Sequence, residues 1–434
     1  MKEAKQLLLC TYYWPPSGGA GVQRSLKFTK YLPIFEVEPT ILTVDELFAT
    51  YPIIDKSLNL EVAENLNVIK TKSKEPFLLY KKISGSKEIP RSGFANSAKP
   101  KLSEKIMRFI RGNFFLPDAR KGWNKYACKA AGSLIETDKI DAILTSSPPH
   151  STQLIGLKLK KKYGLPWIAD MRDPWTDIYY YHELFPSWIA KKIDASYEKK
   201  VLENADRVLV VSESIKKLFL QKSKKINPEK FVVIPNGFDS NDFELKNIPE
   251  NDVFTVSYTG TISSLYDITS FASACKTAFL DKGRNLKLRF IGSSEAVLYP
   301  VLNKFGLLNF SEIIPPVDHK SSINYLLNSD VLLLLIPDNK NNEGILTGKL
   351  FEYLGSGKQI IGIGPENGDA AEIIKKCHAG KMFTYGANQE LSEFLDKMYI
   401  FWEEGRMPVM NENVLYYSRK MQSQHLAHII HSLV

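Results

Sequence analysis

The sequence is poor in the features that mark metal sites, disulfide frameworks and membrane spans. Its 434 residues include four cysteines, at Cys10, Cys128, Cys275 and Cys377, and no two of them form a Cys-x-x-Cys pair. We therefore expect neither a zinc site nor a disulfide framework. No apolar run reaches the roughly 18 residues that cross a bilayer, and the first apolar run is too short for a signal peptide. These absences predict a cytoplasmic protein.

Several common ligand-binding signatures are missing as well. The loop after the first apolar run is not Gly-x-Gly-x-x-Gly and has no Walker lysine, which argues against NAD and P-loop sites. Asp170 and Asp173 stand three apart, so they do not form an Asp-x-Asp metal clamp, and no metal is expected. No motif of stacking aromatic residues with arginine points to RNA or DNA.

Positive charge is concentrated in the first half of the chain. The formal net charge is +9, and residues 1–235 hold 39 Lys and Arg against 25 Asp and Glu, a balance of +14. The remainder therefore carries −5. A basic half beside a mildly acidic half suggests that one domain faces an anionic partner, such as a membrane surface, a phosphorylated lipid or nucleic acid. The alternative is that the lysines serve solubility alone.

Short apolar runs alternate with helical patterns along almost the whole chain. This alternation predicts an α/β fold, in which parallel sheets are covered by helices on both faces. The strands that we expect are Gln6–Thr11, Thr40–Val44, Leu66–Lys70, Ala142–Ser146, Trp167–Asp170, Arg207–Ser212, Val232–Pro235, Thr255–Thr259, Lys287–Ile291, Ser311–Ile314, Val331–Ile336 and Gln359–Ile363.

Length and composition predict two domains. At 434 residues the chain is too long for one hydrophobic core. The polar stretch Asp239–Asp252 is the expected linker, between an N-terminal domain at 1–240 and a C-terminal domain at 250–414. Both are expected to be doubly wound and to face a cleft. Ligands of such sheets bind at the carboxyl ends of the strands, so the cleft is the expected site.

The most informative local pattern is the segment Thr347-Gly-Lys-Leu-Phe-Glu352, which follows a buried strand and opens a helix. Thr347 can cap that helix, whose first N–H groups can then hold an anion. Lys349 and Glu352 are three apart and share one helical face. The lysine suits a diphosphate, and the glutamate suits ribose hydroxyls. An ordinary surface ion pair is the alternative.

A second candidate for phosphate binding follows the first expected strand. The loop contains Gly18, Gly19 and Gly21 and leads into a helix. Glycines allow the backbone to approach a ligand closely and leave helix N–H groups open to a phosphate. Arg24, in the first turn of that helix, could reach the same phosphate. A turn that merely needs glycine is the alternative.

Two more loops leave expected strand ends, where functional residues collect. One carries His150, which could exchange a proton with a hydroxyl. The other carries Asp170, Arg172 and Asp173. We predict that these four residues serve catalysis in the first domain. The alternatives are a structural histidine and a mutual ion-pair cluster of the two aspartates with the arginine.

The segment 73–113 interrupts the alternation and is strongly basic. It carries the amphipathic piece Ile106–Leu116, and Lys101, Lys105, Arg108 and Arg111 lie in or near that piece. This pattern predicts a helix on an anionic membrane surface, or a loop that grips a lipid-linked acceptor. An ordinary insertion with a core-facing apolar stripe is the alternative.

Taken together, the motifs resemble those of family-4-type glycosyltransferases, which have the GT-B fold. The most specific elements of the resemblance are Ile-Pro-Asn-Gly-Phe-Asp and Lys-Leu-Phe-Glu-Tyr-Leu. The segments that carry it are Pro16–Gly21, Leu165–Trp175, Ala205–Ser212, Val233–Asp239, Tyr258–Thr261 and Lys349–Gly357.

The resemblance assigns expected roles in the second domain. Glu352 matches the second glutamate of the family's Glu-x7-Glu motif and would bind the ribose of the nucleotide sugar. The first glutamate would fall at Gly344, with Glu343 out of step by one. Gly260 and Thr261 follow the first strand of that domain, where the family often grips the diphosphate with Arg and Lys. Here the loop has no cation.

The resemblance also bears on the first domain. In the GT-B fold the last helix crosses back onto the N-terminal domain, and the amphipathic pattern Tyr417–Leu433 is placed to do so. We therefore expect residues 415–434 to complete that domain. The histidine that the family usually has in a first-domain loop aligns near Ser146, so His150 is not a clean match.

These observations predict a glycosyltransferase that moves a sugar from a nucleoside-diphosphate sugar to a saccharide or lipid-linked acceptor. The resemblance implies retention at the anomeric carbon, no divalent metal and no cofactor beyond the nucleotide sugar. The basic, apolar first domain suggests cell-surface polysaccharide assembly, of lipopolysaccharide or capsule, at the cytoplasmic face of a membrane. Two alternatives stay open: a nucleotide-sugar epimerase on the same fold, and a non-enzymatic protein that binds anions or nucleic acid.

Overall fold

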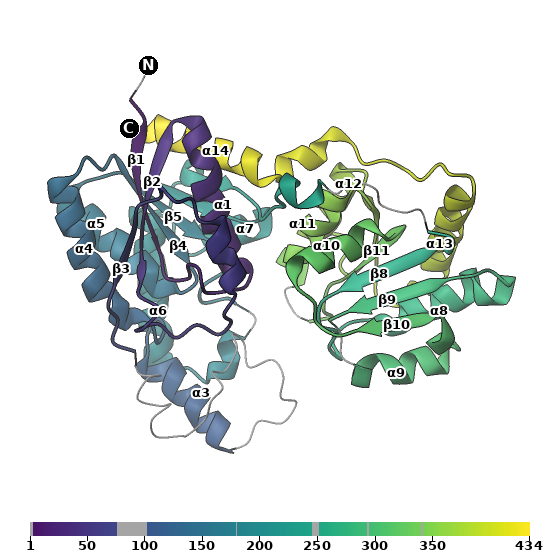
Figure 1. The fold of residues 1–434 in the computed structure, drawn as a ribbon. Coiled ribbons are helices and arrows are strands. Elements are labelled where there is room, and N and C mark those ends of the chain that lie inside the picture. The colour runs from purple at the N-terminus through teal and green to yellow at the C-terminus, as the bar shows by residue number, and fades with distance from the viewer. Residues whose placement is uncertain (1–2, 76–101, 179, 245–250, 293–294, 340–341) are drawn as a thin grey trace. The chain divides into compact units, whose positions relative to one another are not determined.

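The computed structural model describes residues 3–75, 102–178, 180–244, 251–292, 295–339 and 342–434 (Figure 1). The chain divides into two compact α/β units. The first comprises Met1–Pro235 together with Gln422–Val434, and the second comprises Asn236–Met421. Each unit has its own parallel sheet and its own core on both faces of that sheet.

The first unit contains a seven-stranded parallel sheet in the order β3-β2-β1-β4-β5-β6-β7. Its strands are β1 (Lys5–Thr11), β2 (Val37–Val44), β3 (Val68–Thr71), β4 (Ala142–Ser147), β5 (Trp167–Met171), β6 (Arg207–Val210) and β7 (Phe231–Val233). Its helices are α1 (Ala20–Tyr31), α3 (Leu102–Phe114), α4 (Asn124–Thr137), α5 (Gln153–Tyr163), α6 (Trp188–Asn204), α7 (Glu213–Leu220) and most of α14 (Arg419–Leu433).

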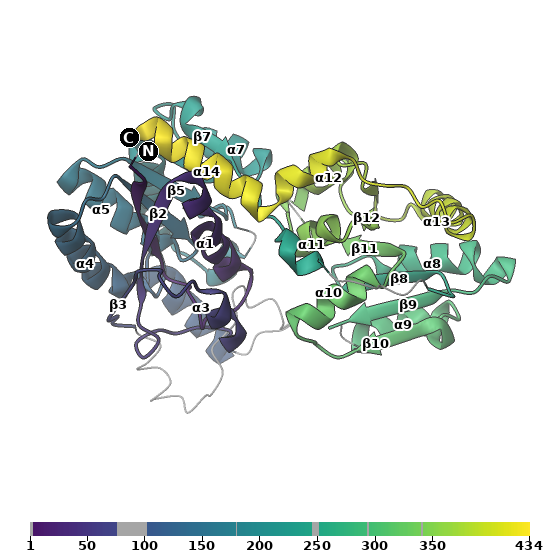
Figure 2. The ribbon, with the colours of Figure 1, turned by 45° about the horizontal axis from the view of Figure 1, so that its top comes forward.

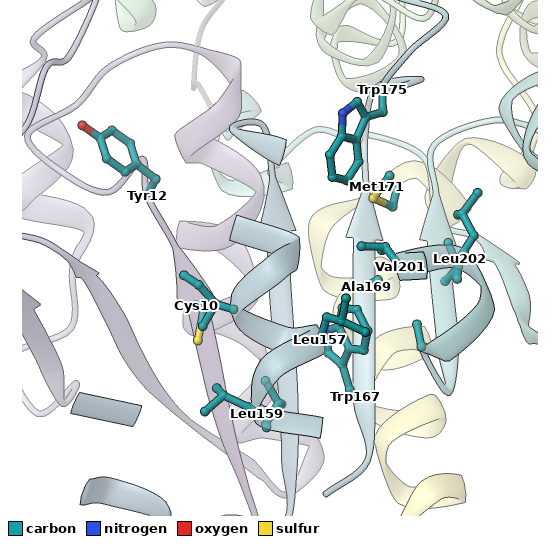
Figure 3. Close-up of a cluster of buried hydrophobic side chains, with 14 of the residues drawn as sticks. Cys10, Tyr12, Leu157, Leu159, Trp167, Ala169, Met171, Trp175, Val201 and Leu202 are labelled. Carbon is teal, nitrogen blue, oxygen red and sulfur yellow. The ribbon is translucent and has the colours of Figure 1, made fainter. Parts of the chain in front are cut away.

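Alternation along β1 divides the first core into two layers. Leu8 and Cys10 face a layer built with α4, α5, α6 and α7, whereas Leu7 and Leu9 face α1 and α14. Successive side chains of a strand point to opposite faces, so a strand that is buried on both faces must be apolar throughout. Figure 3 shows the first layer at β5, where Trp167, Ala169 and Met171 follow one another on one face and Trp175 lies beyond the strand end.

The second unit contains a six-stranded parallel sheet in the order β10-β9-β8-β11-β12-β13. Its strands are β8 (Thr255–Thr259), β9 (Lys287–Ile291), β10 (Ser311–Ile314), β11 (Val331–Leu335), β12 (Gln359–Ile363) and β13 (Gly380–Phe383). Its helices are α8 (Ile268–Ala278), α9 (Glu295–Lys304), α10 (His319–Leu327), α11 (Gly348–Ser356), α12 (Asp369–Lys376) and α13 (Asn388–Glu403). Helices α8, α9 and α13 cover one face, and α10, α11 and α12 cover the other.

The order of strands places a switch point in each sheet. Successive strands run outward in one direction from β1 and in the other from β4, and the same holds for β8 and β11. Loops that leave the carboxyl ends of these neighbouring strands diverge, which opens room for a ligand. The loops after β1 and β4 carry the expected glycines and His150, and the loop after β8 carries Gly260.

The expectation of two doubly wound α/β domains is confirmed, and all twelve expected strands are present. The expectation missed β13, a four-residue edge strand with the sequence Gly-Lys-Met-Phe. Its alternation is too short to stand out, and only its last two residues are buried. Strand β6 is shorter than the expected Arg207–Ser212 and ends at Val210. Ser212 instead caps α7, because its hydroxyl accepts a hydrogen bond from the N–H of Ile215.

The division between the units differs from the expected boundaries at 240 and 415. Residues 236–244 and 415–421 lie with the second unit, because Phe238 and Tyr417 pack into its core. The N–H of Phe238 donates to the Tyr417 carbonyl at 3.1 Å, and the N–H of Arg419 donates to the Phe238 carbonyl at 2.8 Å. Within the expected linker, Ser240–Phe243 form a 3-10 turn, and residues 245–250 lie outside the described residues.

The return of the last helix to the first unit is confirmed. From Gln422 onward α14 belongs to that unit, where Leu426 and Ile430 are fully buried beside Leu7 and Leu9 of β1. Figure 2 shows α14 running alongside α1 in this unit. Throughout the described ranges, none of the helices combines the length and apolar character needed to cross a bilayer.

Candidate active site

The N-terminus of α11 is open in the second unit. Thr347 is the N-cap residue, as expected, but its hydroxyl makes no capping hydrogen bond. That oxygen is buried and has no hydrogen-bond partner among the described residues. Gly348 follows, and nothing lies within 4 Å of the place that a Cβ would occupy there. The first N–H groups of α11 are therefore approachable by an anion.

Lys349 extends from the first turn of α11 to the end of β8. Its amine donates to the Tyr258 hydroxyl at 2.8 Å and lies 4.6 Å from the centre of that ring. Gly260 makes room for it, because a Cβ there would lie 2.3 Å from Cε of Lys349, and the φ of +108° also favours glycine. Burial lowers the pKa of Lys349 to about 8. Attraction to Glu352 opposes this fall, but no carboxylate of the described residues lies within ion-pair distance of this half-buried amine, which is therefore suited to an anionic ligand.

This pKa predicts that diphosphate binding weakens in mild alkali. Only the protonated amine attracts phosphate, and a group with a pKa of about 8 loses its charge as the pH rises from 7 to 9. We expect the affinity for UDP to fall up to about tenfold across this range, measured by titration calorimetry. Lys349→Met should bind UDP weakly at both pH values. A wild-type affinity that is constant from pH 7 to 9 would contradict the assignment.

Glu352 lies one turn further along α11. Its carboxylate is 3.9 Å from Nδ1 of His319, at the start of α10, and Nε2 of the same imidazole is 3.3 Å from Asp242. The side chain of Glu352 is one-third exposed. Burial raises the pKa of this carboxyl, and attraction to His319 opposes the rise. Glu352 thus lies near His319, and Lys349 is bonded to Tyr258. Within the described residues Lys349 and Glu352 attract each other but lie beyond ion-pair distance, unlike the surface ion pair of the alternative interpretation.

The other donor-binding residues expected in the second unit, Gly260 and Thr261, lie at the same edge of its sheet, whereas Gly18, Gly19, Gly21 and Arg24, also expected to bind the donor, lie in the first unit. Gly260 contacts Lys349, and the carbonyl of the exposed Thr261 accepts from the Tyr258 hydroxyl at 3.1 Å. Glu343 lies on the 3-10 turn Asn342–Gly344 and is exposed, and it accepts from Asn367 at 3.3 Å. The structure therefore brings Gly260, Thr261, Lys349 and the start of α11 together.

In the first unit the glycines lie at the start of α1, where they were expected. Gly19 is the N-cap residue, with φ of +93°, and provides no side-chain cap. Gly18 packs closely on the loop at Ile53, because a Cβ there would lie 2.9 Å from Cγ2 of that side chain. A Cβ on Gly21 would lie 3.6 Å from both terminal nitrogens of Arg172. The loop thus places the first turn of α1 beside a guanidinium group.

Arg24 does not fit the phosphate contact expected of it. Arg24 and Asp170 are both fully buried and form a bidentate ion pair, with N–O distances of 3.0 to 3.2 Å. The remaining terminal nitrogen of Arg24 donates to the Pro235 carbonyl at 2.8 Å, and Ser146 donates to Asp170 at 2.8 Å. This geometry favours a structural role for both Arg24 and Asp170, because the donors and acceptors of the pair are used within the core.

Arg172, just after β5, is bonded to the end of β4 and to the first turn of α1. Its Nε donates to the Ser147 carbonyl and its Nη1 to the Gly21 carbonyl, each at 2.9 Å. The second terminal nitrogen is buried and has no hydrogen-bond partner among the described residues. The alternative of a mutual ion-pair cluster does not describe Asp170, because the ion pair of Asp170 is with Arg24. Arg172 holds the loops after β4 and β5 against α1.

His150 and Asp173 lie at the ends of β4 and β5. The His150 ring stacks on Trp175, with ring centres 4.8 Å apart and planes within 11°. Burial lowers the pKa of His150 to about 4, so the imidazole is neutral at pH 7. Burial raises the pKa of Asp173, and attraction to Arg172 opposes this. The raised pKa makes the Asp173 carboxylate the better base for a hydroxyl proton, whereas the lowered pKa leaves His150 a weak base that can still hydrogen-bond a hydroxyl.

Sequence reasoning missed three residues that shape these arrangements. Tyr258 holds Lys349, His319 lies near Glu352, and Asp194 accepts the Trp175 indole N–H at 2.7 Å. Tyr258 stood within a recognised segment but carried no expected role. His319 and Asp194 had no local signal, because their partners are distant in sequence. The described residues contain no cluster suited to a metal ion, and the expected independence of metal stays a prediction.

Comparison with known proteins agrees with the fold. Residues 93–242 match the family model described as Glycosyltransferase Family 4. A glycosyltransferase from Rickettsia africae is 16% identical, with a TM-score of 0.62 over 99% of this chain and 98% of that one. Anabaena HepE in complex with UDP is 12% identical, with a TM-score of 0.61 over 99% and 100%.

The lipopolysaccharide outer core galactosyltransferase WaaB is also similar, with 12% identity and a TM-score of 0.58 over 99% of this chain and 100% of that one. No curated protein matches the sequence at a significant level. The family match and the shared architecture of two Rossmann-like units confirm the expected resemblance. The chain has the two-unit fold of the GT-B glycosyltransferases, and its residues 93–242 match the family model described as Glycosyltransferase Family 4.

Proposed function

We propose that the protein transfers a sugar from a nucleoside-diphosphate sugar to a saccharide or lipid-linked acceptor, with retention and without a metal ion. The observation that carries this proposal is the arrangement at α11. A half-buried lysine, an open helix N-terminus and a carboxylate one turn away match a diphosphate followed by a ribose. We further propose a role in cell-surface polysaccharide assembly, of lipopolysaccharide or capsule, on the cytoplasmic face of a membrane.

The reaction breaks the bond between the anomeric carbon and the diphosphate oxygen, and forms a bond from that carbon to the acceptor oxygen. Lys349 and the N–H groups of α11 would neutralise the charge that develops on the leaving diphosphate. Glu352 would accept hydrogen bonds from the ribose. In the first unit, Asp173 would accept the proton that the acceptor hydroxyl loses as the new bond forms, and His150 would orient that hydroxyl. Arg172, beside the first turn of α1, would face the phosphate of a lipid-linked acceptor.

The similar structures support this choice of donor without deciding it. The solved structures of HepE include complexes with UDP and with UDP-glucose, and WaaB is described as a galactosyltransferase of the lipopolysaccharide outer core. The side chains that line the pocket set the specificity for sugar, nucleotide base and acceptor, and these side chains differ among proteins this distant in sequence. The proposal for this chain therefore rests on its own residues.

A thermal-shift screen with UDP-, GDP-, ADP- and dTDP-sugars tests the proposal. A ligand that binds only the folded state stabilises it by about 2.7 kcal/mol at a hundred times its dissociation constant. We expect one nucleotide class to raise the melting temperature. Conversion of the nucleotide sugar without acceptor would favour the epimerase alternative. Salt-dependent binding of generic oligonucleotides, with no response to any nucleotide sugar, would favour the anion-binding alternative.

Asp173→Asn is expected to separate turnover from donor binding. An amide cannot accept the acceptor's proton, so the single-turnover rate should fall about tenfold or more, equivalent to at least about 1.4 kcal/mol. Nucleotide affinity should stay near the wild-type value. The Arg172 bonds to the Ser147 and Gly21 carbonyls do not involve Asp173, so the melting temperature should change little. A destabilised variant with normal turnover per folded molecule would give Asp173 a structural role.

A further inference from the structure

Helix α6 departs from the pattern of an ordinary surface helix, because it exposes large apolar side chains and buries two carboxylates beside Val201 and Leu202. Trp188, Ile189 and Ile193 are 67%, 52% and 40% exposed, whereas Asp194 and Glu198 are almost completely buried. A helix that packs on a sheet normally turns its apolar stripe inward and its charges outward. Large apolar side chains held in water are costly unless something covers them, so the outer face of α6 is a candidate docking surface.

The charge around this outer face is of one sign. From Trp188 to Lys200 the only acidic residues are the buried Asp194 and Glu198. Lys191, Lys192 and the pair at 199–200 are all exposed. The amine of Lys192 lies 5.0 Å from the centre of the Trp188 ring. Exposed tryptophan and aliphatic residues beside lysines are typical of surfaces that lie at the interface of an anionic bilayer.

Helix α3 extends the same surface. The Asn113 side chain donates to the Phe185 carbonyl at 3.0 Å and accepts from the N–H of Ser187 at 2.7 Å, which fixes the end of α3 to the start of α6. Phe114 is 74% exposed, and Phe109 and Phe185 are also exposed. Arg108 was expected to face the membrane, but it is 4% exposed and pairs with Glu183 at 3.0 Å. Lys101, expected in the same role, lies outside the described residues.

The inner face of α6 holds the loop of the candidate site. Asp194 accepts from the Trp175 indole at 2.7 Å and from Tyr181 at 3.2 Å. Glu198 accepts from the N–H of Thr176 at 3.2 Å and from its hydroxyl at 2.7 Å. Trp175 in turn stacks on His150. One helix therefore presents an apolar, basic face to the outside and fixes the position of Trp175 and its loop on the inside.

We propose that the outer face of α6, with the adjoining end of α3, docks on an anionic lipid surface. Its members are Phe109, Phe114, Phe185, Trp188, Ile189 and Ile193, with Lys191 and Lys192 among them. The inference rests on the proposed function, because a lipid-linked acceptor is reached at a bilayer. It adds that α6, the helix whose outer face meets the bilayer, also fixes the loop at Trp175 and Thr176 through Asp194 and Glu198.

Vesicle flotation of the full chain tests this proposal. Wild type should bind vesicles that contain phosphatidylglycerol, and bind much less to phosphatidylcholine alone or at high salt. Lys191→Ala with Lys192→Ala should weaken binding roughly 30-fold, since each lysine near an anionic surface contributes about 1 kcal/mol and each 1.4 kcal/mol is tenfold. Trp188→Ser should weaken binding on its own. The matched control is Lys224→Ala with Lys225→Ala, two exposed lysines elsewhere in the first unit, which should bind as wild type does.

Three outcomes would overturn the proposal. The wild type could fail to bind anionic vesicles at low salt, or the control pair could lose binding as much as the α6 pair. The chain could also self-associate and become monomeric in Trp188→Ser, in which case a second copy covers the face. The lysine variants are exposed substitutions, so they test the surface even if Trp188→Ser folds poorly. Nucleotide-induced stabilisation, measured on every variant, tests the proposed function separately from vesicle binding.

Discussion

Asp170→Ala is expected to destabilise the first unit by about 3–5 kcal/mol, the usual effect of removing one partner from a buried ion pair. Arg24 would remain fully buried, with two of its nitrogens facing a vacated space and only the Pro235 carbonyl as a partner. The Ser146 hydroxyl would lose its acceptor as well. Urea unfolding monitored by circular dichroism should show this loss as a lower urea concentration at the midpoint of the transition.

Ser146→Ala is the matched control for this variant. It removes a single hydrogen bond to Asp170 and leaves the ion pair in place, so we expect a loss of only about 1 kcal/mol. Arg24→Met combined with Asp170→Leu removes both charges, and should be more stable than Asp170→Ala because no unpaired charge is left. If Asp170→Ala unfolds like wild type but loses turnover, the residue serves catalysis, as the sequence alone predicts.

Glu352→Ala is expected to weaken UDP or GDP binding about 30-fold or more. The variant loses two hydrogen bonds from a charged acceptor to ribose hydroxyls, together about 2–4 kcal/mol after a discount for non-additivity. Titration calorimetry gives the affinity directly. The carboxylate is one-third exposed and meets His319 only at 3.9 Å, so the melting temperature without ligand should change little.

Glu343→Ala provides the comparison for that experiment. Glu343 is also a carboxylate of the second unit, near the position of the family's first glutamate, but it is exposed and bonded to Asn367. We expect its loss to change nucleotide affinity by less than about threefold, the range of an ordinary surface substitution. Wild-type affinity in Glu352→Ala, or an equal loss in Glu343→Ala, would contradict the assignment of Glu352 to the ribose.

Two features could be predicted from the sequence because both depend on local pattern: the strands, and the placement of the site residues at the carboxyl ends of those strands. A buried parallel strand is apolar throughout, and the residues after it lie at its carboxyl end wherever the strand is placed. His150, Gly260 and Lys349 were located by this rule. The edge strand β13 was missed because its four residues bury only two side chains.

What the sequence determined by itself is which residues stand at the strand ends and which residues begin the helices that follow them. Only the tertiary structure decided their partners, since Arg24 and Asp170 are 146 residues apart and their pairing depends on how α1 packs beside β5. The same holds for α6, where Trp188 and Ile193 have the composition of core residues. Packing put Asp194 and Glu198 inside and those side chains outside, because the Trp175 indole donates to Asp194 and the Thr176 N–H donates to Glu198.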